Sequence, residues 1–439
     1  MQIAQQILFI LLAGIAIFIF VRKARFISRN IKLGRDEKFE SNPQRWKNVL
    51  LMAFGQKRMF DKQMVALLHF IVYAGFIIIN IEILEIVLDG IFGTHRLFAP
   101  YLGSFYSFVI NFFEVLAFLV LTSCAIFLIR RNMVKVRRLN MTELNGWPRS
   151  DANYILIFEI VLMTLFLLMN AADKALQLKG YGHYADVETN FLVSGIITPL
   201  FQNLNTGALL AIERTAWWLH IAGIFVFLNY LPYSKHLHII LAFPNTYYTR
   251  LKPQAKMLNM PEIQNEVLYA MQPETAPAAA TEEHKRFGAK DVFDLTWKNL
   301  LDAYTCTECG RCTAACPANN TGKMLSPRKI MMDTRDRMEE VGAGIDKKGK
   351  LEEDGKSLLH DYITTEELWA CTSCQACVQV CPVLIDPLHI INQLKRYLAL
   401  EESKQPQEWN GMYSNIENNF APWKFSPEER DRWALEMND

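Results

Sequence analysis

Eight of the nine cysteines fall into two copies of one spacing, C-x2-C-x2-C-x3-C-P. Thiolates at the x2 spacing can converge on one centre from a single loop, and in paired ferredoxins the fourth cysteine ligates the other cluster. The pattern therefore predicts two 4Fe-4S clusters that exchange their fourth ligands. The first is expected on Cys306, Cys309, Cys312 and Cys381, and the second on Cys371, Cys374, Cys377 and Cys316.

Structural zinc is the alternative for such cysteines, but zinc sites usually take one C-x2-C pair per knuckle. The start of the chain indicates where the cysteines reside. Residues 1–20 are apolar, have no basic start and are followed by Arg22, Lys23 and Arg25, which favours a retained membrane helix over a cleaved signal peptide. The cysteines are thus expected to be metal ligands in a reducing compartment, with Cys124 as a small packing residue.

Composition divides the chain into two unlike halves. The 46 basic and 45 acidic residues leave a net charge of +1, which argues against a nucleic-acid binder. The mean hydropathy of +0.07 averages long apolar runs in the first half with a charged remainder. Five segments can cross a bilayer, at residues 3–20, 64–88, 104–129, 154–170 and 208–230. Segment 191–204 contains Pro199 and is expected to be an interfacial helix or a re-entrant loop.

Basic residues are distributed unequally between the two sides of these segments. Loops 21–63 and 130–152 are rich in Lys and Arg, whereas the opposite loops carry only Arg96, Lys174 and Lys179. Loops rich in Lys and Arg stay in the cytoplasm. The pattern predicts an integral protein of a bacterial or archaeal cytoplasmic membrane, with its N-terminus outside and its cysteine-rich half in the cytoplasm.

Histidines within the membrane segments are candidate cofactor ligands. His69 lies near the cytoplasmic end of the second segment. His238 follows His220 by 18 residues, or five helical turns, so the two are expected on one face about 27 Å apart. By the same periodicity, His236 would point about 160° away from that face. His69 and His238 would then share one depth, as the axial ligands of a b-type heme do.

His220 would lie at the opposite depth, and no histidine partner for it is evident on the second segment. Ile79 stands ten residues beyond His69 on that segment. For each of these histidines the alternative is a satisfied polar contact without a cofactor.

Two membrane stretches carry a resemblance to known cytochromes. Trp218-Leu-His220, together with the stretch from Leu231 to His238, resembles the last helix of the nitrate reductase gamma subunit and of the heterodisulfide reductase cytochrome b subunit. Ala66-Leu-Leu-His69 is similar to the inner ligand site of the second helix in the nitrate reductase family. The resemblance implies a five-helix cytochrome that exchanges electrons with a quinone. Since Ile79 replaces the second histidine of that helix, one heme b is expected, and a second heme involving His220 stays open.

The soluble half resembles a second family. Cys316-Pro-Ala-Asn-Asn-Thr-Gly and Leu325-Ser-Pro-Arg328 resemble the ferredoxin-like C subunit of heterodisulfide reductase. The fusion of both halves, over about residues 1–400, resembles membrane Fe–S oxidoreductases that link electron-transfer flavoprotein or related cytoplasmic donors to menaquinone. Such proteins often carry CCG motifs that hold a further cluster. No adjacent cysteine pair and no cysteine after Cys381 occurs here, so that centre is expected on a separate subunit.

The expected fold is mainly α. A five-transmembrane-helix bundle at residues 1–250 is followed by a linker at 251–286, an α-helical two-cluster ferredoxin domain at 287–400 and a charged tail at 401–439. The tail contains three tryptophans, which suggest docking: Trp409, Trp423 and Trp433.

The expected function is that of a membrane-bound electron-transfer subunit, which passes electrons between a cytoplasmic redox partner and the quinone pool. Two alternatives are an electron-wire subunit of a heterodisulfide or sulfite reductase-like complex, and a non-enzymatic Fe–S redox sensor or anchor. No dinucleotide fingerprint or P-loop occurs. Intramembrane acids are expected either to carry protons for the quinone or to cap helices and pair with Arg96 or Arg214: Glu82, Glu85 and Glu114.

Overall fold

The computed structural model describes residues 2–186, 189–251, 256–276 and 286–437, and this part of the chain is helical and without strands. Five of its helices are long and apolar enough to cross a membrane, which confirms the predicted bundle. They are α1 (Gln2–Ile31), α3 (Gln63–Phe92), α5 (Ser104–Asn132), α6 (Trp147–Leu178) and α8 (Thr206–Tyr230). The prediction of a mainly α fold is therefore confirmed.

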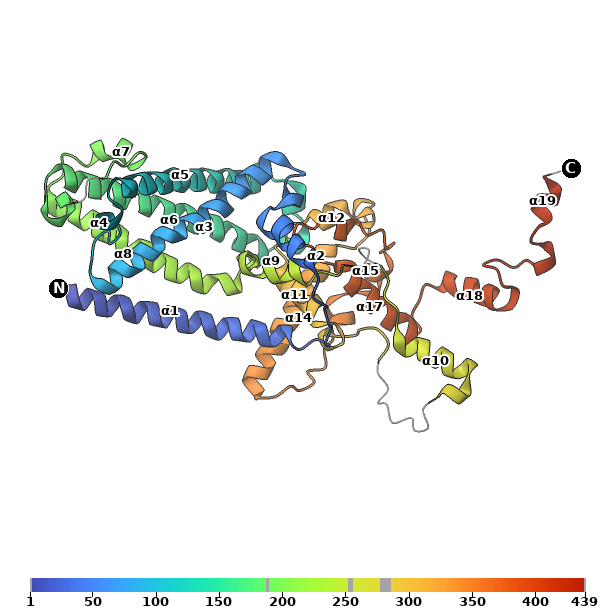
Figure 1. Ribbon diagram of the computed structural model, residues 1–439. Coiled ribbons are helices and arrows are strands. Elements are labelled where there is room, and N and C mark those ends of the chain that lie inside the picture. Colours follow the sequence, from blue (N-terminus) through green and yellow to red (C-terminus); the bar gives the residue numbers. More distant parts are fainter. Residues whose placement is uncertain (1, 187–188, 252–255, 277–285, 438–439) are drawn as a thin grey trace.

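Lipid-facing surface and close packing explain why these segments form a bundle. Large apolar side chains such as Ile3 and Phe108 are mostly exposed, as expected for helices in contact with lipid. Small residues allow the helices to approach each other closely. A Cβ on Gly223 of α8 would lie 2.7 Å from Leu162 of α6, so a larger residue there would separate the two helices. Figure 1 shows α1 at the edge of the bundle, running towards the cysteine-rich region.

The intramembrane acids belong to a polar network at the end of the bundle remote from the cysteines. Arg96 donates hydrogen bonds to Asp173 and Asn170, and the Tyr106 hydroxyl donates one to Glu85. Glu114 accepts hydrogen bonds from Asn170 and from two backbone N–H groups of segment 191–204. That segment forms α7 (Ser194–Ile197) and a short 3-10 turn, Thr198–Leu200. Glu85 and Glu114 therefore have structural partners, whereas buried Glu82 Oε2 has none among the described residues.

The fifth membrane helix does not continue to His238, so the five-turn extrapolation from His220 is wrong. Helix α8 ends at Tyr230, and two 3-10 turns cover Leu231–Tyr233 and Lys235–Leu237 before α9 (His238–Tyr247) begins. Pro232 lacks the N–H that would continue the helix, and its ring is incompatible with the preceding turn. The break turns His236 back towards His238, and their ring centroids lie 5.8 Å apart.

The cysteine-rich region is built from short helices around two long ones. These elements are α11 (Trp297–Thr305), α12 (Arg311–Ala315), α13 (Pro317–Asn320), α14 (Pro327–Lys348), α15 (Thr365–Trp369), α16 (Ala376–Gln379) and α17 (Pro387–Leu400). A single apolar core joins α11, α14 and α17, with Leu300, Ile330 and Leu394 fully buried. The tight core holds the cysteine loops at the ends of these helices.

The last turns of α1 are part of this same core, which the sequence did not reveal. Ile27 packs into it. Asn30 is fully buried and donates hydrogen bonds to the Tyr304 hydroxyl and to the Met338 carbonyl, at 3.0 and 3.3 Å. Lys23 forms an ion pair with Glu339 at 2.8 Å. The first helix therefore ties the membrane bundle to the cysteine-rich region.

Two further segments lie apart from this core. The predicted linker contains α10 (Pro261–Met271), and the tail contains α18 (Gln407–Asn419) and α19 (Arg432–Glu436). Figure 1 shows the tail projecting away from the membrane bundle. Trp409 contacts Trp369 with ring centroids 5.0 Å apart, whereas Trp423 and Trp433 are exposed.

Replacing Asn30 with Ala is expected to lower the free energy of unfolding by about 1–3 kcal/mol, because buried hydrogen-bonding groups lose their partner. The readout is urea denaturation of the purified protein, followed by its iron–sulfur absorbance. Arg25→Ala, on the exposed face of the same helix, is the control and should shift the free energy by less than about 0.5 kcal/mol. Equal denaturation midpoints for the two variants would contradict the role of Asn30.

Candidate metal centre and the histidines beside it

The structure gathers the eight cysteines around two adjoining cavities. One cavity is lined by Cys306, Cys309, Cys312 and Cys381, with Cys377 at its edge. The other is lined by Cys316, Cys371, Cys374 and Cys377. The fourth cysteine of each motif thus lies with the first three of the other motif, as the exchanged-ligand arrangement requires. We call these the first and the second cysteine set.

The two cysteine loops share one backbone conformation. Glu308 and Gly310 flank Cys309 with φ of +54° and +70°, and Ser373 and Gln375 flank Cys374 with φ of +55° and +67°. Residues in the left-handed conformation on both sides of the central cysteine give each loop a tight turn. This turn directs the three thiols of the loop to one side. Gly310 adopts this conformation without strain, whereas Gln375 does so at a cost that the surrounding contacts must offset.

Burial and mutual proximity disfavour the deprotonated form of the cysteine thiols when no cation lies between them. Burial raises the pKa of the Cys312 thiol well above its usual range, and the neighbouring cysteines raise it further. Thiolate is the form that binds metal, so such a cluster of thiolates needs a cationic centre between them. Within the described part of the chain, no three His, Cys, Asp or Glu side chains come close enough to hold a single metal ion. Two complete C-x2-C-x2-C-x3-C-P motifs favour two iron–sulfur clusters over structural zinc.

Arginines from the membrane bundle cover the first cysteine set. Arg58 donates hydrogen bonds to the carbonyls of Cys381 and Val378, at 2.9 and 3.2 Å, and Arg138 donates one to the carbonyl of Cys309. Arg311 in turn donates one to the carbonyl of Arg58 at 2.8 Å. Lys235, just before His236, pairs with Glu308 of the same loop. The first set is therefore enclosed at the junction with the bundle.

The second set faces outward. Cys374 is the exposed member of this set, and Lys395 donates a hydrogen bond to the carbonyl of Cys371 at 2.6 Å. Cys377 lines both cavities, so the two sets are neighbours. From the surface to the membrane bundle, the order is therefore exposed Cys374, the other cysteines of the second set, the first set, and finally Arg58 and Arg138.

His69 and His238 lie next to the first set. Their ring centroids are 6.4 Å apart with the ring planes tilted by 44°. His69 Nδ1 is hydrogen bonded to Gln56 Oε1, and His238 Nδ1 to the Lys235 carbonyl, both at 3.0 Å. An oxygen partner fixes the proton on Nδ1 and leaves a lone pair on Nε2. Lys235, whose carbonyl bonds to His238, also pairs with Glu308, so the histidine pair lies near the first cysteine loop.

Gln56 and His236 were not found from the sequence as members of this site. Gln56 is nearly buried and adopts a left-handed conformation in the loop before α3, which aims its side chain at His69. No local pattern signals this role for a lone glutamine. The ring of His236 packs against Phe227 and Phe76, and burial lowers its pKa to about 3, so the ring is neutral.

His220 stands apart from the other histidines. Its Nδ1 is hydrogen bonded to the Leu162 carbonyl at 3.0 Å, and its ring contacts Phe166. No histidine ring contact to it occurs among the described residues. The predicted ligand His220 therefore has an orienting hydrogen bond but no histidine partner across the bundle.

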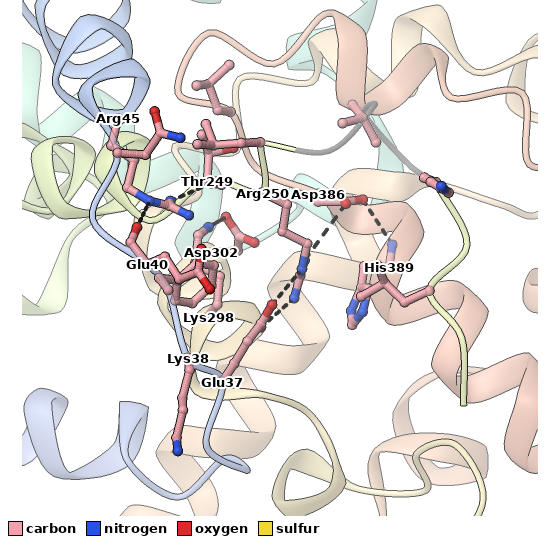
Figure 2. A pocket seen from close by; sticks show the side chains of 17 residues that line it. Glu37, Lys38, Glu40, Arg45, Thr249, Arg250, Lys298, Asp302, Asp386 and His389 are labelled. Atoms are coloured by element: carbon pink, nitrogen blue, oxygen red, sulfur yellow. Dashed lines mark hydrogen bonds and ion pairs between the residues drawn. The ribbon is translucent and has the colours of Figure 1, made fainter. Parts of the chain in front are cut away.

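A polar cavity of about 410 Å³ is lined by loop 37–45, the segment around Arg250, α11 and the start of α17 (Figure 2). Arg250 forms a bidentate pair with Glu37 and lies 3.9 Å from Asp386. Buried Lys298 is hydrogen bonded to Asp302 and Asn245. Arg250 and Lys298 are thus already paired with residues of the chain. These polar contacts connect loop 37–45 to α11 and α17.

The geometry defines a two-cluster iron–sulfur region packed on a membrane bundle, and comparison with known proteins agrees. Residues 305–385 match the 4Fe-4S dicluster domain family, so this region binds 4Fe-4S clusters, and the eight cysteines fit two of them. No solved structure matches the chain.

Three relatives extend the match. The chain is 30% identical to a probable iron-sulfur-binding oxidoreductase, FadF, of Bacillus subtilis, over 100% of the chain and 62% of that protein. It is 27% identical to an EtfAB:quinone oxidoreductase of Syntrophomonas wolfei, over 97% of the chain and 59% of that protein. The chain thus spans about three fifths of the length of these two relatives.

The third relative matches the cysteine-rich part. It is the C subunit of a ferredoxin/F(420)H(2)-dependent CoB-CoM heterodisulfide reductase of Methanosarcina acetivorans, 31% identical over 27% of the chain and 60% of that relative. The resemblance to Fe–S oxidoreductases with a heterodisulfide reductase C-like domain is therefore confirmed, and the chain joins a 4Fe-4S dicluster region to five helices that are long and apolar enough to cross a membrane.

Replacing Arg58 or Arg138 with Gln is expected to make the first cluster harder to reduce, because a nearby positive charge favours the extra electron. The shift should be on the order of 50 mV towards negative potential for that cluster alone. Redox titration followed by EPR of the purified protein measures both clusters. Arg432→Gln, in the exposed tail, is the charge-matched control and should shift neither. Equal shifts of both clusters would contradict the assignment of the arginines to the first set.

Proposed function

We propose that this protein is a membrane-bound electron-transfer subunit that passes electrons between a cytoplasmic redox partner and the quinone pool. Two 4Fe-4S clusters on the two cysteine sets would form the soluble part of the path. A b-type heme held by His69 and His238 would form the membrane part. The spacing of these two rings is the observation on which the proposal depends.

The ring spacing suits axial coordination of one metal. Metal–imidazole bonds of about 2.0–2.1 Å, with each nitrogen just over 1 Å from its ring centroid, put two axial ring centroids about 6.3 Å apart. The centroids of His69 and His238 lie 6.4 Å apart. Both Nδ1 atoms are hydrogen bonded to oxygen, which leaves both Nε2 lone pairs available. Metal-bound histidines in proteins are usually oriented by such a hydrogen bond on the other ring nitrogen.

When bound, the heme would supply one-electron redox chemistry between the clusters and the quinone. The residues of the chain would position it. Gln56 and the Lys235 carbonyl orient the two imidazoles, and Lys235 also pairs with Glu308 of the first cysteine loop. The order of sites then gives a continuous path from exposed Cys374 to the membrane.

The orientation across the membrane is part of the proposal. The loops rich in Lys and Arg are the ones that contact the cysteine-rich region, through Arg58 and Arg138 in particular. Since such loops remain in the cytoplasm, the cluster region would be cytoplasmic and the N-terminus outside. The polar network around Arg96 and Asp173 would then face the outer side.

One heme per chain is expected. His220 has no histidine partner, so a second bis-histidine heme finds no support in the contacts of the described residues. Ile79 occupies the place on the second helix where a partner for His220 would stand.

The names of the relatives suggest the partners. One relative is an EtfAB:quinone oxidoreductase, so electron-transfer flavoprotein is proposed as the cytoplasmic partner and quinone as the membrane substrate. The match to a heterodisulfide reductase C subunit favours a second candidate, in which the chain is the electron wire of a related complex with a separate CCG-domain Fe–S protein. Both functions use the same path and differ in the partner that docks near Cys374.

Replacing His69 or His238 with Ala is expected to abolish the b-type absorbance bands of the dithionite-reduced protein, while EPR of the iron–sulfur clusters persists. His220→Ala is the control and should retain the bands with a heme-to-protein ratio near one. Bands that survive in both His69→Ala and His238→Ala would exclude this ligand pair. Lack of the bands in the unmodified protein would exclude the heme and favour a redox sensor or anchor.

The partner can be tested with the purified full chain reconstituted in lipid nanodiscs. Reduced electron-transfer flavoprotein is expected to reduce the clusters and the heme in sequence in a stopped-flow experiment. If the flavoprotein does not react, and affinity purification from the native membrane yields a CCG-type Fe–S protein, the heterodisulfide reductase-like alternative is correct.

A further inference from the structure

A large apolar groove lies between α1 and α9, outside the cysteine and histidine sites. Its volume is about 790 Å³, within the usual range for small-molecule sites. Phe20, Ala24 and Ile27 lie on one face of α1 and line one wall. The other wall comes from α9 and the turn before it, and the floor comes from α11: Leu237, Ile240, Leu241, Trp297 and Leu301.

The groove runs from the membrane side to the cytoplasmic side. Lys23 Nζ lies 4.7 Å from the ring centroid of Tyr233, which fixes the register of α1 against the turns that precede α9. Further along, Trp297 N donates a hydrogen bond to the Arg35 carbonyl, and the Trp297 ring contacts Tyr248 at 5.0 Å. Phe20 and Pro232 therefore lie towards the bilayer, and Tyr248 lies towards the cytoplasm.

The cytoplasmic end offers polar groups without partners. Ser28, Lys32 and Tyr248 line the groove, and their side chains have no hydrogen-bond partner among the described residues. All three can donate a hydrogen bond. The groove thus complements an amphipathic ligand with a long apolar tail in the bilayer and a planar, hydrogen-bond-accepting head between Trp297 and Lys32.

We propose that this groove is the binding site of a prenylated quinone, an inference that rests on the proposed function. The tail lies along Phe20 and Ala24, and a ring carbonyl accepts hydrogen bonds from Tyr248 and Lys32.

The position of the groove between the redox centres favours a quinone over a phospholipid. Leu237 lines the groove and directly precedes His238. Leu301 lines its floor and precedes Cys306 by five residues on α11, which packs against α9. A ligand in the groove would therefore lie against the residue that precedes His238 and against α11, the helix that ends at Cys306, whereas a structural lipid would gain nothing from this placement.

The proposed site also determines from which side of the membrane the quinone takes up its protons. Reduction of the bound quinone takes two electrons, which the redox centres of the proposed function would supply, and two protons, which convert both ring carbonyls to hydroxyls. Lys32 and Asp36 are exposed at the cytoplasmic end and connect the head to water on that side. The paired acids Glu85 and Glu114 at the other end of the bundle are then not required as proton carriers.

The test uses the full chain in nanodiscs and two quinol probes, the tail-less menadiol and a naphthoquinol with a prenyl tail. Reduction of the heme by each quinol is followed by absorbance. Ala24→Phe fills the membrane end of the groove and should raise the half-saturating concentration of the prenylated quinol at least tenfold, with a smaller effect on menadiol. Tyr248→Phe removes a donor at the head and should weaken both quinols about fivefold to tenfold.

Ile19→Phe is the matched control, because Ile19 lies on the exposed surface of α1 outside the groove, and its kinetics should be unchanged. Heme and cluster spectra should be unchanged in all three variants. Unaltered quinol kinetics in both Ala24→Phe and Tyr248→Phe would overturn the groove as the quinone site, as would loss of a co-purifying phospholipid from Ala24→Phe with quinol kinetics unchanged. If the unmodified protein does not react with either quinol, the proposed function itself fails.

Discussion

Arg58 and Arg138 donate hydrogen bonds from loops of the membrane bundle to the backbone carbonyls of Cys381 and Cys309. These contacts hold the first cysteine loop against the bundle and place positive charge beside it. Charge and hydrogen bonds near an iron–sulfur cluster raise its potential, and solvent exposure is a further determinant. The covered first set and the second set, of which Cys374 is exposed, therefore differ in nearby charge and in solvent exposure, two determinants of cluster potential.

The same contacts determine the position of the histidine pair. Lys235 pairs with Glu308 of the first cysteine loop, and its backbone carbonyl orients His238 one turn later. One residue thus links the cluster loop to the proposed heme ligand. The break of the fifth helix at Pro232 makes this possible, because a continuous helix would carry residues 235–238 away from the cluster loop.

Repeated chemical patterns made much of the molecule predictable from the sequence. Uninterrupted apolar runs predicted the five long helices, and two equal cysteine motifs predicted the dicluster region, because both signals are local. The sequence suggested a common depth for His69 and His238 from an unbroken fifth helix, but that helix ends at Tyr230, and the pairing of the two rings depends on tertiary packing. The role of Gln56 and the position of His236 could not be predicted, since the first depends on a left-handed loop residue and the second on how the chain turns after Pro232.

The contacts of α1 with the cysteine-rich region could not be predicted from the sequence either, because the residues that α1 contacts there lie about 300 residues later in the chain. Asn30, Lys23 and Ile27 become buried or paired only when α11 and α14 are present. During synthesis, the C-terminal end of the first helix therefore emerges before α11 and α14, and its interface stays incomplete until most of the chain has been made. Because the bundle precedes the cysteine-rich region along the chain, the bundle offers the surface against which that region folds.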